Sequence, residues 1–302
     1  MKRDPGVDVV RGVAVLSMFI AHFAPSDGPF KLLMLSEFLT APLFALLVGV
    51  GAQLGRNRSS ARSTLVRAGV LIALGLWLQR LSTQIVEVLL WLGLLTLVCW
   101  ALVRLSTTGV AVVATVLYAL GPVLHERLIG DGRLIVMILA ADPVDRLTDF
   151  IVWAGAGILV VRLVKRRVVV GITALLATAA LFALDKAGVA SLDPYSGTYQ
   201  QNAFSALLSV AVFCGASVLL GRVWALAAVG GMSLSLYVAQ FLVDWAYLAT
   251  QPVGTFDDSW AIVAAMILGS VAAAVAWHLR FGSLRSRFRR GPLEGLVGML
   301  GG

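Results

Sequence analysis

Long apolar stretches are the feature that most limits what this chain can fold into. Crossing the hydrocarbon core of a bilayer takes a helix of about 20 apolar residues. In lipid the backbone must satisfy its own hydrogen bonds, so only helices or a closed barrel can span it, and barrel strands alternate over about ten residues. We therefore predict an all-α bundle of about ten transmembrane helices, one domain over residues 1–280 with a basic tail at 281–302. The predicted helices are 7–24, 32–54, 64–82, 84–103, 109–124, 148–164, 168–184, 202–220, 223–247 and 259–280.

Composition excludes several other classes of protein. With 59% hydrophobic and 13% charged residues, the chain has too little polar surface to cover a soluble core. The net charge of +8 does not indicate nucleic-acid binding, because the basic residues form short clusters between apolar stretches. Cys99 and Cys214 lie inside apolar stretches, so neither a disulfide framework nor a metal site is predicted.

The distribution of lysine and arginine predicts the orientation. Of the 24 basic residues, 18 fall on the side that holds the N-terminus: Lys2, Arg3, Arg11, Arg56, Arg58, Arg62, Arg67, Arg104, Arg162, Lys165, Arg166, Arg167, Arg222, Arg280, Arg285, Arg287, Arg289 and Arg290. The other six are Lys31, Arg80, Arg127, Arg133, Arg146 and Lys186. Lysine and arginine are enriched in the cytoplasmic loops of membrane proteins. The alternation of basic-rich and basic-poor loops therefore predicts a multi-pass inner-membrane protein with both termini in the cytoplasm. The tail is expected to contact anionic lipid headgroups.

The first helix carries two polar residues that a plain membrane helix does not need. His22 lies eleven positions after Arg11, about three turns, so both project from one face, about 16 Å apart along the axis. Asp8 lies one turn before Arg11 and can pair with it. Two interpretations stay open: Arg11 as a charge anchor with His22 as an interfacial cap, or both as functional groups.

The ninth predicted helix carries a polar stripe. Ser233, Tyr237, Gln240 and Asp244 follow one another in steps of four, three and four, which places them on one face. Ser233 fits a hydrogen bond between helices, a structural role. Asp244 is the functional candidate, since a carboxylate within a span needs a partner or a water-filled cavity.

Other polar residues lie near the outer helix ends. Glu37 and Glu87 are predicted at the outer ends of the second and fourth helices, and an Arg80–Glu87 ion pair is as compatible with the sequence as a catalytic role. In the long polar connection 125–147, residues 134–141 are apolar but too short to span, so a re-entrant or interfacial piece is expected. His125 and His278 are expected to be solvated.

Three segments resemble known families. Asp8-Val-Val-Arg11-Gly12 followed by His22 resembles the first helix of type-three integral-membrane acyltransferases. Residues 231–240, 288–294 and 66–97 resemble the YeiB-like bacterial family, with Glu87 at that family's usual Asp. Both are similar to the heparan-glucosaminide N-acetyltransferase group. This chain departs from the YeiB-like pattern at His22, where Asn is usual, and from the type-three pattern at Gln240, where His is usual.

The resemblance implies an acyltransferase that moves an acyl group, acetyl first, from cytoplasmic acyl-CoA to an outer-face hydroxyl or amine of a sugar, lipid headgroup or metabolite. His22 would be a general base or carry the acyl group, and Asp244 or Glu37 would fix its tautomer. The residues expected to bind donor or substrate are Arg11, Arg56, Arg58, Arg62, Arg67, Glu87, Ser233, Tyr237 and Gln240. Acyl-CoA is a co-substrate, and no permanently bound cofactor is expected.

A transporter or lipid flippase is the alternative, with Asp244 or Glu87 as a proton relay. Against it, the sequence shows no pair of Gly- or Pro-broken helices in two matching halves. The expected partners are membrane lipids, acyl-CoA and the small-molecule, sugar or lipid acceptor, and nucleic acid is not among them. A homodimer is compatible with the sequence.

Overall fold

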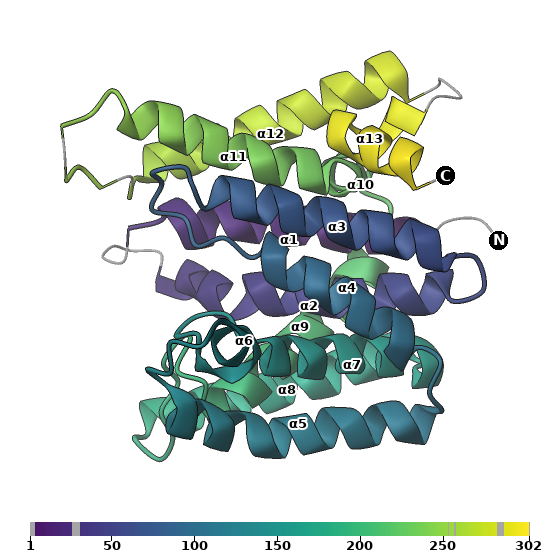
Figure 1. Ribbon diagram of the computed structural model, residues 1–302, viewed down its shortest axis with the longest axis vertical. Helices are drawn as coiled ribbons and strands as arrows, with labels where there is room; N and C mark the ends of the chain where they lie inside the picture. The colour runs from purple at the N-terminus through teal and green to yellow at the C-terminus, as the bar shows by residue number, and fades with distance from the viewer. Residues whose placement is uncertain (1–3, 26–30, 253, 257, 283–286, 302) are drawn as a thin grey trace. The chain divides into compact units, whose positions relative to one another are not determined.

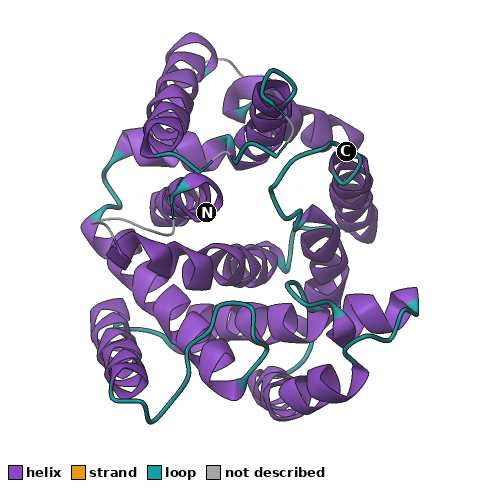
Figure 2. Cartoon of the chain, turned by 90° about the vertical axis from the view of Figure 1, so that its left-hand side faces the viewer, coloured by secondary structure: helices purple, strands orange, loops and turns teal. Residues whose placement is uncertain are grey.

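The computed structural model describes residues 4–25, 31–252, 254–256, 258–282 and 287–301, and no strand occurs among them (Figures 1 and 2). The α-helices are α1 (Pro5–Phe23), α2 (Ser36–Gly55), α3 (Ala61–Leu78), α4 (Leu89–Leu102), α5 (Thr107–Leu128), α6 (Leu134–Val136), α7 (Leu147–Leu163), α8 (Arg167–Lys186), α9 (Tyr199–Leu219), α10 (Trp224–Gly231), α11 (Ser233–Leu248), α12 (Trp260–Phe281) and α13 (Pro292–Leu300). Short helical turns are η1 (Lys31–Leu35), η2 (Met137–Ala141) and η3 (Arg287–Arg290). The predicted all-α class is confirmed.

Seven helices in the described ranges are long and apolar enough to cross a membrane, and a bent pair would make an eighth. The seven are α1, α3, α5, α8, α9, α12 and the span Leu33–Gly55, which contains α2. Helices α4 and α7 are shorter, with 14 and 17 residues. The predicted stretch 84–103 becomes helical only at Leu89, after a polar segment in which Gln84 Nε2 donates to the carbonyl of Thr255 at 2.8 Å. The number of ten membrane-spanning helices therefore stays a prediction.

The predicted helix 223–247 is divided at Met232. Helices α10 and α11 meet there at an angle of 71°. The amide of Met232 still donates to the carbonyls of Ala228 and Val229, at 3.2 and 3.0 Å, which ends α10. Gly230 and Gly231 precede the break, and glycine weakens a helix by about 1 kcal/mol relative to alanine. Gly230 is needed because a Cβ there would overlap the carbonyl oxygen of Asp8 on α1.

The chain forms two compact units. Unit 1 comprises Met1–Thr40, Ala73–Glu87 and Ala216–Gly302. There α1 packs against α10, α11 and α12, and α11 against α13. Gly12 lies so close to Leu226 of α10 that a Cβ would overlap the Leu226 carbonyl. Such small residues allow two helix backbones to approach closely.

Unit 2 comprises Ala41–Ile72 and Val88–Gly215, where α4 and α5 pack against α7. Here Gly49 of α2 meets the carbonyl of Ala154, and Gly157 of α7 meets that of Leu46. The single domain over 1–280 and the separate tail 281–302 stay predictions.

The orientation can be tested by labelling. In a chain without Cys99 and Cys214, Asp258→Cys should react with an impermeant thiol reagent on intact cells, whereas Arg289→Cys should react only after lysis. Both positions are exposed, so access is decided by the side of the membrane. Reaction of Arg289→Cys in intact cells would contradict the cytoplasmic C-terminus that the basic residues predict.

Candidate active site

His22 contacts the polar face of α11. It lies in the last turn of α1, and its Nδ1 is 3.3 Å from Oε1 of Gln240. The Nε2 amide of Gln240 donates to Sδ of Met18 at 3.2 Å, which leaves the amide oxygen facing the imidazole. An amide oxygen only accepts hydrogen bonds, so Nδ1 of His22 carries the proton and Nε2 keeps its lone pair. This tautomer is the one a general base requires at Nε2.

The buried face of α11 contains Tyr237, Gln240 and Asp244, with 3%, 0% and 2% of their surfaces exposed. The ring of Tyr237 packs on Phe241, with centroids 5.3 Å apart. Their spacing predicts one shared face of the helix, and in the structure these three residues are buried in unit 1, while Ser233 is half-buried at the start of α11. The sequence suggested Asp244 or Glu37 as the group that orients His22; in the structure Gln240 makes that contact.

Near its start, helix α2 is hydrogen-bonded to α1 through two hydroxyl groups. Thr40 donates its hydroxyl to the carbonyl of Ser36 at 2.8 Å, so the 2.9 Å contact with Ser17 of α1 is a bond that Ser17 donates. Glu37 lies in this first turn of α2, half-buried. In the described part of the chain no hydrogen bond joins Glu37 to His22.

The expected donor-binding arginines belong to different units. Arg11, in unit 1, forms an ion pair with Asp8 at 3.0 Å. The cluster of unit 2 is exposed and consists of Arg56, Arg58, Arg62 and Arg67.

Glu87 is buried at 5% exposure and accepts a hydrogen bond from Nε2 of Gln79 at 3.3 Å. Arg80 is exposed, and the Arg80–Glu87 ion pair stays a prediction.

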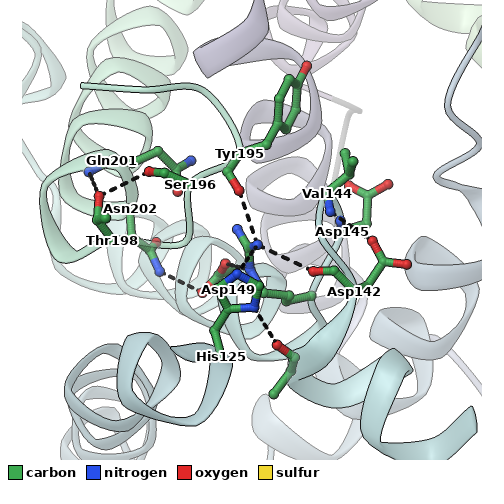
Figure 3. Close-up of polar contacts among 12 residues, drawn as sticks. His125, Asp142, Val144, Asp145, Asp149, Tyr195, Ser196, Thr198, Gln201 and Asn202 are labelled. Carbon is green, nitrogen blue, oxygen red and sulfur yellow. Dashed lines mark hydrogen bonds and ion pairs between the residues drawn. The ribbon is translucent and has the colours of Figure 1, made fainter. Parts of the chain in front are cut away.

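A second polar group lies in unit 2, and sequence reasoning missed it (Figure 3). We call it the Arg146 cluster; its members are His125, Arg146, Asp149 and Asn202. Nε of Arg146 donates to Oδ2 of Asp149 at 2.7 Å, and Oδ1 of Asp149 accepts from Nδ2 of Asn202 at 2.7 Å. Arg146 and Asp149 are each 2% exposed, so this is a fully buried ion pair.

His125 completes the Arg146 cluster. It was expected to be solvated, but it is 7% exposed, and Nδ1 lies 2.8 Å from the carbonyl of Ala140 in η2. Since a carbonyl only accepts, Nδ1 carries the proton, and Nε2 faces Nη1 of Arg146 at 3.5 Å. Arg146, expected in an outer loop, is one of the largest fully buried side chains.

A loop before α9 closes over the Arg146 cluster. The carbonyl of Tyr195 accepts from Nη1 of Arg146 at 3.2 Å, and Tyr195 has a left-handed backbone with φ of 62°. Gly197 follows with φ of 70°, and a Cβ there would come within 2.6 Å of Cδ2 of His125. Glycine is therefore required at this position.

The fold and the two polar groups define a multi-pass α-helical membrane protein with a half-buried histidine oriented by an amide. The family model described as "Heparan-alpha-glucosaminide N-acetyltransferase, catalytic" matches residues 3–153, and the chain belongs to this family. The matched segment contains Arg11, His22, Glu37 and Glu87 but ends before α11. No curated protein and no solved structure matches the chain. Membership indicates a membrane acetyltransferase.

Proposed function

We propose that the protein transfers an acyl group, acetyl as the first candidate, from cytoplasmic acyl-CoA to a hydroxyl or amine acceptor at the outer face of the cell membrane. The observation that carries the proposal is the contact between His22 and Gln240, because it leaves Nε2 of His22 as a proton acceptor. Family membership supplies the reaction class.

The chemistry balances with His22 as the base. Nε2 takes the proton from the acceptor O–H or N–H, and the acceptor atom attacks the thioester carbonyl. The new C–O or C–N bond forms, the C–S bond breaks, and CoA leaves as a thiolate that takes the acceptor's proton from the imidazolium. Transfer through a short-lived acyl-imidazole at Nε2 is the other route the residue allows, with the same overall balance.

Arg11 is the proposed contact for the donor's phosphates. It lies at the N-terminal half of α1, away from His22, and its partner Asp8 is largely buried. A guanidinium presents several N–H donors in a planar fork, a geometry that suits the oxygens of a phosphate. For the exposed arginines of unit 2, donor binding stays a separate prediction. The acceptor is proposed to be a sugar, a lipid headgroup or a metabolite.

One observation favours a transporter as the second candidate. The break between α10 and α11 is a broken span of the kind that carriers use near their substrates. It is the only bent pair found among the described residues, whereas carriers with inverted repeats break a helix in each half. Acyltransferase therefore ranks first.

Donor binding gives a direct test. CoA should raise the melting temperature of the purified protein, since a ligand at 100 times its Kd adds about 2.7 kcal/mol to stability. Arg11→Ala should shrink the shift, and added salt should weaken it. The control is Arg127→Ala, which removes an exposed arginine of unit 2 and should bind CoA like the wild type. The absence of any shift at millimolar CoA would favour the transporter.

A further inference from the structure

Helix α11 starts at a break, so its first amides need acceptors from elsewhere. Glu294 of α13 supplies them, although it lies about 60 residues further along the chain. Its Oε1 accepts from the amide of Leu234 at 2.7 Å and from that of Ser235 at 3.1 Å. The carboxylate thus acts as an N-cap, and its charge lies at the positive end of the helix dipole.

The contact is reciprocal. Ser235 donates its hydroxyl to Oε2 of Glu294 at 2.5 Å and accepts from the amide of Leu293 at 3.1 Å. Gly291 makes room for this arrangement, because a Cβ there would overlap Oε2 of Glu294. The backbone carbonyl of Phe288, just before α13, accepts from Nε1 of Trp277 on α12 at 2.9 Å. The C-terminal segment is therefore attached to α11 and α12 together.

The capped helix is the one that orients His22. Gln240 lies six residues after Leu234, about 9 Å along the axis at 1.5 Å per residue. The 71° break at Met232 removes the continuity with α10 that would otherwise fix the direction of α11. The cap at the start of α11 and the packing of its buried face must then set where Gln240 stands.

We propose that Glu294 is a positioning residue for the His22 site: it holds α11 so that Gln240 keeps His22 in its reactive tautomer. The inference rests on the proposed function. A misplacement of about 1 Å at a catalytic group can cost about 10²-fold in rate. Glu294 itself touches no reacting atom, and it acts through α11.

The test uses the purified full-length protein and three variants. Glu294→Ala removes the cap, Glu294→Gln keeps an acceptor oxygen without the charge, and Glu126→Ala removes an exposed glutamate of α5 as the control. In the hydrolysis of labelled acetyl-CoA, with water as the acceptor, Glu294→Ala should lower kcat by 10-fold to 10²-fold while KM for acetyl-CoA changes little. Glu294→Gln should recover part of kcat, and Glu126→Ala should match the wild type.

A second readout does not depend on turnover. Diethyl pyrocarbonate modifies neutral imidazole nitrogens, and mass spectrometry measures its rate at His22. This rate should change several-fold in Glu294→Ala and stay unchanged in Glu126→Ala. If the wild type shows no acyl transfer but the rate at His22 changes, the proposed function fails while the positioning role stands. If folded Glu294→Ala and Glu294→Gln both match the wild type in kcat and in the His22 rate, the positioning role is wrong.

Discussion

Replacing His22 by alanine should lower the rate of acyl transfer by about 10²-fold or more, while the protein still inserts and still binds CoA. The reason is the contact with Gln240, which places the proton on Nδ1 and leaves Nε2 to accept one. Without the imidazole, Gln240 and Met18 retain their own contact, so the packing around α11 changes little. The measurement is the initial rate of product formation or hydrolysis from labelled acetyl-CoA, beside CoA binding by thermal shift.

Two further variants decide what the loss means. His278→Ala is the matched control, because His278 is exposed at the end of α12, and its activity should equal that of the wild type. His22→Asn keeps much of the shape and hydrogen bonding but has no titratable nitrogen, so it should be as inactive as His22→Ala. If His22→Asn retains full activity, His22 is not the base, and Asp244 on the same buried face becomes the leading candidate.

The fold class and most of the long helices were predictable because a bilayer imposes a length and a composition that any sequence shows directly. The break at Met232 was not, because Gly230 and Gly231 fit an apolar helix as well as a broken one. The need for glycine at the break comes from the close approach of Gly230 to Asp8, a contact between residues more than 200 positions apart.

The candidate site was predictable in part. The spacing along α11 placed Tyr237, Gln240 and Asp244 on one face, and all three are buried. The partner of His22 was not predictable, because sequence reasoning favoured a carboxylate and the contact spans 218 residues. Glu294 lies in the segment 288–294 that resembles a known family, but its role as a cap was not predictable. A cap that comes from 59 residues away leaves no local pattern in the sequence.

The Arg146 cluster was missed for a different reason. Counting basic residues treats every arginine between two spans as a loop charge. Arg146 is instead buried against Asp149, and Asp149 is held by Asn202 from another helix. The spacing of three between Arg146 and Asp149 at the start of α7 is a local signal for a pair, but only the assembled fold shows that the pair is buried and that Asn202 meets it.

Replacing Arg146 by methionine should be among the most destabilising single changes in unit 2. It leaves the Asp149 carboxylate buried without its cation, and breaking a buried pair in this way costs about 3–5 kcal/mol. It also removes the donor to the Tyr195 carbonyl, which holds the loop over the Arg146 cluster. The melting temperature in detergent, followed by tryptophan fluorescence, should fall clearly below that of the wild type.

The double variant Arg146→Met with Asp149→Leu separates charge from packing. It removes both buried charges, so it should recover much of the stability lost in Arg146→Met alone, since apolar replacement of a whole buried pair is often neutral. Arg133→Ala is the matched control: Arg133 pairs with Asp131 at 2.7 Å in an exposed loop, and screening by water should leave stability nearly unchanged. If Arg146→Met melts like the wild type, Asp149 is not an uncompensated buried charge, and the ion pair does not hold unit 2 together.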